Sequence, residues 1–222
     1  MLVSVEHLSL GYERQAVIND ISFDIEEKDF VIVLGSNGVG KSTLIKGMLG
    51  LIKPLSGKIH FNTENIGYMP QETRVDPNFP ASVMEVILSG FINKMGLRPF
   101  YGKEEKKKAL EIMEILKISD LKRRVFSELS GGQRQKVLLA RSLCATDKLL
   151  ILDEPSNNLD QKSKSEFYTT LKHLNEGHNV TIVMITHDID NDSLIGNKVL
   201  ALSTDGYYFG KTDEYLEANL WY

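Results

Sequence analysis

Five consecutive apolar residues, Phe30 to Leu34, run directly into a glycine-rich stretch, and this junction constrains the fold more than any other part of the chain. An uninterrupted apolar run of this length is typical of a strand buried on both faces, as in parallel sheets covered by helices. The next residues, Gly35 to Ser42, have the spacing Gly-x-x-x-x-Gly-Lys-Ser, and a helical stretch covers Lys41 to Leu49. We therefore expect a strand, a tight loop and a helix in direct succession.

The glycine-rich stretch is suited to hold phosphate groups. Glycines let successive backbone N–H groups turn inward toward phosphate oxygens, and the following helix adds the positive end of its dipole. We expect Lys41 to reach the β- and γ-phosphates of a nucleotide and the Ser42 hydroxyl to ligate Mg²⁺. The predicted nucleotide contacts are Gly35, Ser36, Asn37, Gly38, Val39, Gly40, Lys41, Ser42 and Thr43.

A second apolar run, Lys148 to Leu152, ends in two neighbouring carboxylates. The carboxyl ends of parallel strands form the edge of a sheet at which ligands bind, so Asp153 is expected to hold Mg²⁺. Glu154 is offset by one residue. We expect it to face the space beyond the γ-phosphate, where a general base acts on an attacking water.

The rest of the chain alternates between strand-like and helical patterns. A third apolar strand, Val180 to Ile185, follows a helical stretch, and buried strands that alternate with helices predict a parallel α/β sheet. From about residue 70 to 145 the pattern is helical, which predicts an inserted helical subdomain. Further strands are expected at Val3–Leu10, Ile21–Ile25, Lys58–Phe61, Ile66–Met69, Val199–Ser203 and Tyr207–Phe209, and further helices at Ser82–Ile92, Glu104–Leu116, Gln133–Ala145 and Ser163–Leu174.

Composition narrows the function classes. Hydrophobic residues make up 42% and charged residues 25% of the 222 residues, and the formal net charge is −4. These values exclude a disordered chain, and the lack of a basic excess disfavours a dedicated nucleic-acid binder. The single cysteine, Cys144, suits a reducing compartment. The N-terminal stretch has no signal-peptide pattern, and no apolar run approaches the length of a membrane span.

Several other charged or aromatic stretches are interpreted as ordinary surface or core. The run Lys103 to Lys108 is interrupted by two glutamates and reads as a solvated helix face. The helix expected at Glu104–Leu116 begins within this run. It carries Leu110, Met113 and Leu116 at helical spacing, which predicts an apolar face. At the carboxyl end, residues 220–222 are expected to pack against the sheet. The histidines expected on the surface, because they are not spaced as metal ligands, are His7, His60, His173 and His178.

A second glycine motif, Leu129 to Gln133, precedes the helix that ends at Ala145. Ser130 is suited to cap this helix, so the motif offers a hydroxyl and free backbone amides to an anion. It has no lysine or metal carboxylate of its own, and on the motif alone a plain capped helix is the alternative. A head-to-tail pair of chains lets each half-site cover the nucleotide of the other subunit. The predicted residues of the half-site are Ser130, Gly131, Gly132 and Gln133.

Three segments together resemble the ATP-binding cassette (ABC) ATPases. They are the motif Leu-Ser-Gly-Gly-Gln, the Gly-x-x-x-x-Gly-Lys-Ser stretch and the segment Leu-Leu-Ile-Leu-Asp-Glu-Pro. The resemblance covers nearly the whole chain, in the family's order. It implies one domain over residues 1–222 with a P-loop NTPase (RecA-like) α/β core at 1–70 and 148–222. It also implies an N-terminal antiparallel β subdomain and a helical subdomain at about 71–147.

Four more residues match family positions. Gln71 resembles the glutamine that touches Mg²⁺ and signals to the membrane partner, and His187 resembles the histidine that contacts the γ-phosphate. Asp160 resembles an aspartate at the dimer interface. Tyr12 lies where the family places an aromatic ring that stacks on adenine, and a surface aromatic residue is the alternative. Ser36 stands where many relatives carry proline, a difference that leaves the backbone amides intact.

The resemblance implies ATP hydrolysis coupled to transport. Two ATP molecules would bridge two copies of the chain, which would work from the cytoplasmic side of the cell membrane on separate integral membrane permease subunits. Residues 79–90 and 164–168 resemble ATPases of bacterial zinc and manganese importers, which implies a divalent metal ion as cargo and, indirectly, an extracytoplasmic solute-binding protein. The alternatives are a soluble ABC ATPase such as one for cluster assembly, a transporter ATPase for another substrate, and a nucleotide-gated module without turnover.

Overall fold

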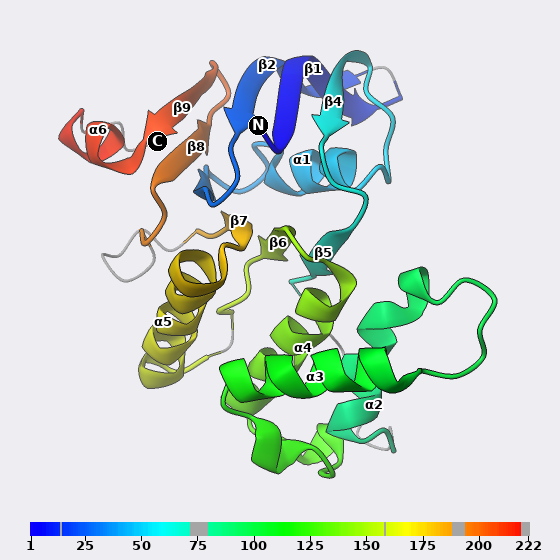
Figure 1. Cartoon of the computed structure of the whole chain (residues 1–222). Helices are drawn as coiled ribbons and strands as arrows, with labels where there is room; N and C mark the ends of the chain where they lie inside the picture. The colour runs from blue at the N-terminus through cyan, green and yellow to red at the C-terminus, as the bar shows by residue number, and fades with distance from the viewer. Residues whose placement is uncertain (14, 72–79, 158, 188–193, 219–222) are drawn as a thin grey trace.

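The computed structural model describes residues 1–13, 15–71, 80–157, 159–187 and 194–218 (Figure 1). Figure 1 shows an antiparallel sheet, a central sheet and a group of helices stacked from top to bottom. The carboxyl-terminal residues 220–222, for which the sequence predicts packing against the sheet, lie outside the described residues.

The central sheet contains the three apolar runs that the sequence predicts as buried strands. Within the described residues its order is β5 (Ile66–Met69), β6 (Leu149–Asp153), β7 (Thr181–Ile185), β3 (Phe30–Leu34), β8 (Lys198–Leu202) and β9 (Tyr207–Lys211). The first five strands of this order are parallel, and β9 returns antiparallel to β8 as the predicted hairpin. The α/β class and the parallel sheet are therefore confirmed.

Alternate residues of each central strand face opposite sides of the sheet. Leu150 and Leu152 of β6 join the core on the side of the large helices, whereas Leu149 and Ile151 join the core on the side of the antiparallel sheet. All four side chains are fully buried. Because both faces are covered, a polar side chain on either face would lose contact with water at a cost in folding free energy. This explains the continuous apolar runs.

The smaller sheet is antiparallel, with the order β2 (Gln15–Ile25), β1 (Val3–Tyr12) and β4 (Ser56–Phe61). The helix α1 (Lys41–Met48) lies between this sheet and the central sheet (Figure 1). Leu44, Ile45 and Met48 of α1 share one hydrophobic core with Val31 and Val33 of β3. This packing holds the first turn of α1 directly beyond the end of β3.

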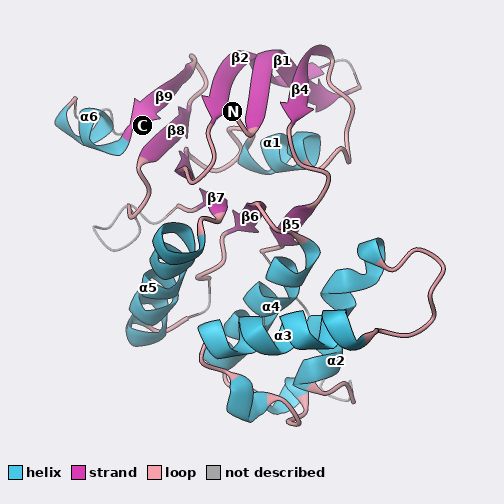
Figure 2. Ribbon diagram, viewed as in Figure 1, coloured by secondary structure: helices cyan, strands magenta, loops and turns pink. Residues whose placement is uncertain are grey.

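Helices cover the other face of the central sheet (Figure 2). The α-helices of this layer are α2 (Val83–Leu88), α3 (Lys103–Ile115), α4 (Gly131–Ala145) and α5 (Gln161–His178), and the 3-10 segments are η1 (Ser89–Lys94), η2 (Ser119–Leu121) and η3 (Phe126–Glu128). A short helix, α6 (Thr212–Glu217), lies beside β9. The carboxyl-terminal half of α4 rests on β5, where the Ser142 hydroxyl donates to the Tyr68 carbonyl oxygen at 2.9 Å. The division of the chain into domains stays a prediction.

Two details of the helical stretch differ from the sequence expectation. The helix predicted to reach Ile92 is α-helical only to Leu88 and continues as the 3-10 segment η1. Leu110, predicted to lie on the apolar face of its helix with Met113, is 39% exposed, whereas Ala109 takes the buried position beside Met113. The true inward face therefore begins one residue earlier than the spacing of the larger apolar residues suggests.

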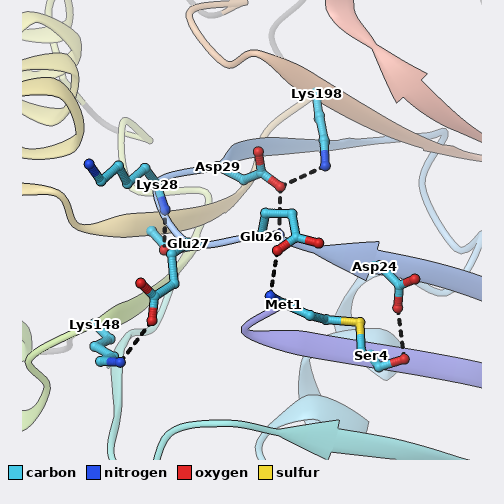
Figure 3. A network of polar contacts seen from close by, with 10 residues as sticks. Met1, Ser4, Asp24, Glu26, Glu27, Lys28, Asp29, Lys148 and Lys198 are labelled. Carbon is cyan, nitrogen blue, oxygen red and sulfur yellow. Dashed lines mark hydrogen bonds and ion pairs between the residues drawn. The ribbon is translucent and has the colours of Figure 1, made fainter.

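A polar network fixes the turn between β2 and β3 (Figure 3). Asp29 is 6% exposed and accepts hydrogen bonds from the Glu26 backbone N at 2.7 Å, from Asn197 Nδ2 at 3.0 Å and from Lys198 Nζ at 2.7 Å. Asn197 Oδ1 in turn accepts from the Phe30 backbone N at 2.7 Å. These bonds hold the start of β3 against β8. They thereby help to fix the position of β3, from which the glycine-rich loop begins.

Candidate functional site

The glycine-rich loop joins β3 to α1 at the carboxyl edge of the central sheet. Gly40 caps α1 with φ at 114°, a left-handed conformation that favours glycine, and this N-cap residue makes no side-chain hydrogen bond to the first helical N–H groups. Val39 is buried in the core next to α1, whereas Ser36 and Asn37 are exposed. The backbone of the loop is thus anchored at one point while its amides at the helix start stay available to an anion.

Lys41 is the cation of this loop. Its side chain is held by the loop itself, because Nζ donates to the Gly35 carbonyl oxygen at 2.6 Å and to the Ser36 carbonyl oxygen at 3.0 Å. The residue is 7% exposed. Burial lowers the pKa of the Lys41 ammonium, and the charges of Glu154 and Asp153 act in the opposite direction. The lysine and the two carboxylates therefore belong to one electrostatic site.

Asp153 is the last residue of β6 and is 9% exposed. Burial raises the pKa of its carboxyl group, and the neighbouring Glu154 raises it further, while a hydrogen bond from Tyr68 and the charge of Lys41 lower it. The pKa of Tyr68 is raised by burial and by Asp153. Tyr68 lies on β5 in register with Ile151 of β6, and the sequence analysis missed it as a partner of Asp153.

Glu154 follows β6 in a left-handed conformation with φ at 47°. Its backbone N donates to the Ile185 carbonyl oxygen of β7 at 3.0 Å. Its side chain is 13% exposed, and Oε2 accepts from Gln71 Nε2 at 2.5 Å and lies 3.5 Å from His187 Nδ1. Residues after β5, β6 and β7 thus meet at one carboxylate, because the three parallel strands end at the same edge.

The donor set at this edge fits a magnesium ion. The Asp153 carboxylate and the Ser42 hydroxyl are hard oxygen ligands, and the Gln71 carbonyl oxygen is another. Asp153 is buried and its pKa is raised, so a nearby cation would offset the cost of its negative charge. Ser42 follows Lys41 in the first turn of α1.

The second glycine motif forms a capped helix end. Ser130 Oγ accepts from the Gln133 backbone N at 3.4 Å, and Gln133 Oε1 accepts from the Ser130 backbone N at 3.2 Å, so the predicted N-cap is confirmed as a capping box. Ser130 and Gly131 are exposed. The reciprocal cap stabilises the helix end and leaves it at the surface.

Asp160 lies beside this motif. It caps α5, because Oδ1 accepts from the Ser163 backbone N at 3.0 Å and Oδ2 accepts from Ser163 Oγ at 2.7 Å. A Cβ placed on Gly132 would lie 3.2 Å from the same Ser163 Oγ. Gly132 and Asp160 therefore both adjoin Ser163, at the starts of α4 and α5.

Tyr12 ends β1 and is 45% exposed. Its hydroxyl accepts from Lys46 Nζ at 3.2 Å, and this hydrogen bond, with a second one involving Thr43, lowers the pKa of the phenol. Lys46 and Thr43 belong to α1, the helix that follows the glycine-rich loop. An exposed ring thus lies over the helix that begins at Lys41, where it is available for stacking.

The histidines expected on the surface are exposed: His7, His60, His173 and His178. No group of three or more potential metal-binding histidine, cysteine or carboxylate side chains occurs in the part of the chain that the structure describes. Within the same residues, no helix combines the length and the apolar character needed to cross a bilayer.

Comparisons with known proteins agree with this geometry. The sequence profile of the ABC transporter family matches residues 18–157. The high-affinity zinc uptake system ATP-binding protein ZnuC of Bacillus subtilis (strain 168) is 36% identical over 209 residues, covering 90% of this chain and 90% of the relative. The molybdate import ATP-binding protein MolC of Haemophilus influenzae (strain ATCC 51907 / DSM 11121 / KW20 / Rd) is 34% identical over 211 residues, covering 95% and 82%. A solved structure assigned to the metal-chelate type of ABC transporter, in an inward-facing conformation, shares 34% identity with a TM-score of 0.88 and covers 97% of this chain and 85% of that one.

Proposed function

The chain belongs to the ABC transporter family, and on this premise we propose that it is the ATP-hydrolysing subunit of an importer for a divalent metal ion, zinc or manganese. The observation that carries the proposal is the meeting of Gln71, Glu154 and His187 around one carboxylate oxygen beside Lys41. A nucleotide-gated module without turnover would have no need of a base with two further polar groups arranged around it.

The proposed reaction is attack of water on the γ-phosphorus of ATP. Glu154 takes the proton of the water as its oxygen bonds to phosphorus, and the bond between the γ-phosphorus and the bridging oxygen of ADP breaks. Lys41, the amides of the loop from Gly35 to Gly40 and His187 stabilise the charge on the phosphate oxygens. Mg²⁺ held by Asp153, Ser42 and Gln71 would supply further neutralisation of that charge. Tyr12 is proposed to stack on the adenine ring.

The proposed active form is a dimer. Ser130 and Gly131 are exposed at a capped helix end, and Asp160 binds Ser163, which adjoins the same motif, so this surface offers an anion site within a motif that contains no lysine. A second copy, related by two-fold symmetry, would supply the glycine-rich loop and its nucleotide. Each nucleotide would then be enclosed by residues of both copies.

The proposed membrane partner is a permease that docks on the helical layer from the cytoplasmic side. Three apolar side chains are exposed on η1 and the segment after it: Ile92 at 59%, Leu97 at 104% and Phe100 at 82%. Large apolar side chains at full exposure are typical of interaction surfaces. An extracytoplasmic solute-binding protein would act through the permease and not through this chain. No contact with nucleic acid is proposed.

Steady-state ATP hydrolysis tests the enzymatic part of the proposal. We expect the variant Glu154→Gln to lose at least about a hundredfold in kcat, because it keeps the shape of the side chain but cannot take the proton. Glu176→Gln, an exposed change on α5, serves as the control and should keep the wild-type rate. Equal rates for Glu154→Gln and the wild type would remove Glu154 as the base.

Affinity isolation from detergent-solubilised membranes tests the partner and the cargo. We expect an integral membrane permease to co-purify, and uptake of radioactive zinc or manganese to stop when Glu154→Gln replaces the wild type. Because one relative is a molybdate import protein, molybdate uptake should be measured in the same cells. If molybdate uptake requires the chain and uptake of zinc and manganese does not, the assignment of a divalent metal ion as cargo is overturned. If the chain is recovered only in soluble complexes, the transporter assignment is overturned.

A further inference from the structure

The turn that follows Glu154 contains an amide side chain that the sequence analysis did not single out. Asn157 Nδ2 donates to Glu154 Oε2 at 2.5 Å, and the Asn157 backbone N donates to the Glu154 carbonyl oxygen at 3.2 Å. Pro155 follows Glu154 within this turn and restricts its backbone. The turn is therefore closed twice by the same residue, once through the main chain and once through the side chain.

The Glu154 carboxylate depends on such donors. Its side chain is 13% exposed, so it has lost most of its contact with water. Among the described residues, its hydrogen bonds fall on Oε2, from Gln71 Nε2 and from Asn157 Nδ2, and His187 Nδ1 approaches the same oxygen at 3.5 Å. Hydrogen bonds to an ionised oxygen are stronger than those between neutral groups, and two of them on one oxygen fix the plane of the carboxylate. The other oxygen, Oε1, is then the one that can face a water molecule.

The two amide donors differ in how they are anchored. Gln71 lies two residues after β5 and is 83 positions away from Glu154 in the chain. Asn157 lies next to Ser156, which is 2% exposed and whose hydroxyl is hydrogen-bonded to the Tyr168 hydroxyl of α5 at 2.8 Å. Tyr168 is itself buried in the core beside the central sheet. Asn157 thus belongs to the same turn as Glu154 and follows a residue whose side chain is tied to the core.

We infer that Asn157 is a positioning residue for Glu154, whose amide orients the carboxylate so that Oε1 faces the attacking water. The inference rests on the proposed function, because it assigns Asn157 a role within ATP hydrolysis. A base must lie within hydrogen-bond reach of the proton that it takes, and small errors in its position cost large factors in rate. Asn157 does not touch the nucleotide in this scheme and acts only through Glu154.

The first test compares two variants of the full-length chain with a matched control. Asn157→Asp keeps the shape but replaces the donor with a negative charge, and Asn157→Ala removes the side-chain donor without adding charge. Both should lower kcat about tenfold or more, with KM for ATP and the Kd of ATP unchanged within about twofold. Asn175→Asp is the control, because Asn175 is also half-buried and donates through Nδ2, but to carbonyl oxygens of Lys28 and Val180 away from the site. It should leave kcat unchanged, and urea unfolding should show that all variants are folded.

A double-mutant cycle gives a readout that a merely structural role would not change. Single-turnover hydrolysis is measured for Glu154→Gln with and without Asn157→Asp. If Asn157 acts through Glu154, the second substitution should cause no further loss in this background. The inference would be overturned if Asn157→Asp lowered the hydrolysis rate by the same factor in the wild type and in Glu154→Gln. It would also be overturned if kcat of both Asn157 variants stayed within about twofold of the wild-type value. Neither result would contradict ATP hydrolysis itself. A wild-type chain that does not turn over ATP, or Glu154→Gln at the wild-type rate, would overturn the proposed function and the inference together.

Discussion

The side-chain amide of Gln71 lies 2.5 Å from Oε2 of Glu154, although 83 positions separate the two residues in the chain. Gln71 follows β5 and Glu154 follows β6, and these strands are parallel neighbours in the central sheet. Along the chain, the next described element after Gln71 is α2 of the helical layer. The proposed base is therefore in direct contact with a residue that precedes, in the chain, the helical layer on which the permease is proposed to dock.

Removal of the loop cation should weaken nucleotide binding. We expect Lys41→Ala to raise the Kd of ATP about tenfold to a hundredfold, because a charge-assisted hydrogen bond to phosphate is lost. Titration with ATP by calorimetry measures the effect. Lys53→Ala removes an exposed lysine after α1 and should change the Kd by less than about twofold. A Lys41→Ala variant that binds ATP like the wild type would contradict the assigned role of the loop.

A negative charge at the second glycine motif should prevent ATP-dependent pairing of two chains. Ser130→Asp keeps an N-cap side chain on α4 but places a carboxylate where the γ-phosphate of the other copy is proposed to bind. We expect Glu154→Gln to form a dimer in ATP and the double variant with Ser130→Asp to stay monomeric, as measured by light scattering after size exclusion. Ser119→Asp, at an exposed serine of η2, is the control and should still dimerise. Dimerisation of the Ser130→Asp double variant would count against the composite site.

The polar network at the start of β3 should contribute to stability. Asp29→Ala removes the acceptor of three hydrogen bonds and leaves Lys198 without its buried partner. We expect the free energy of unfolding in urea to fall by about 2 to 3 kcal/mol. Asp24→Ala removes an exposed carboxylate that accepts only from Ser4 Oγ in the described residues, and should cost less than about 1 kcal/mol. Similar losses for both variants would show that burial of the network is not what stabilises it.

One surface ion pair should make a small contribution that depends on pH. A hydrogen bond from Lys108, supported by Lys94, lowers the pKa of Asp147. A carboxyl group with a lowered pKa in the folded state stabilises the fold above its unfolded pKa of about 3.9, and this stabilisation is lost as the pH falls through the folded value. Because the Asp147 side chain is 60% exposed, Asp147→Asn should cost less than about 1 kcal/mol at pH ~7, and the difference from wild type should shrink as the pH falls below ~3.9.

Urea unfolding midpoints across this pH range measure the effect, with Asp205→Asn in the exposed turn between β8 and β9 as the control. That control should differ from the wild type by a constant amount. A loss from Asp147→Asn that persists unchanged at the lowest pH would show that the ion pair is not its cause.

The local features of this fold were predictable wherever a few neighbouring residues decide them. The apolar run at β3 and the glycines after it define the strand and the loop, and the serine caps with a partner three residues later mark the starts of α2 and α4. Leu110 was predicted wrongly because helical spacing alone cannot say which side of α3 meets its neighbours, and Ala109 is small enough to pack closely there. Tyr68 was missed because its hydrogen bond to Asp153 crosses from one strand to another.

The sequence by itself determined the residue types that are proposed to bind phosphate, hold a metal ion and take a proton, because these properties depend on the chemistry and spacing of short segments. Only the tertiary structure decided which of these residues meet. Gln71, Glu154 and His187 share one carboxylate oxygen because three strands end at one edge, and Asn157 joins them through a turn tied to α5. The physical reason is that hydrogen bonding at a buried carboxylate is set by distances across the sheet, and those distances follow from packing rather than from position along the chain.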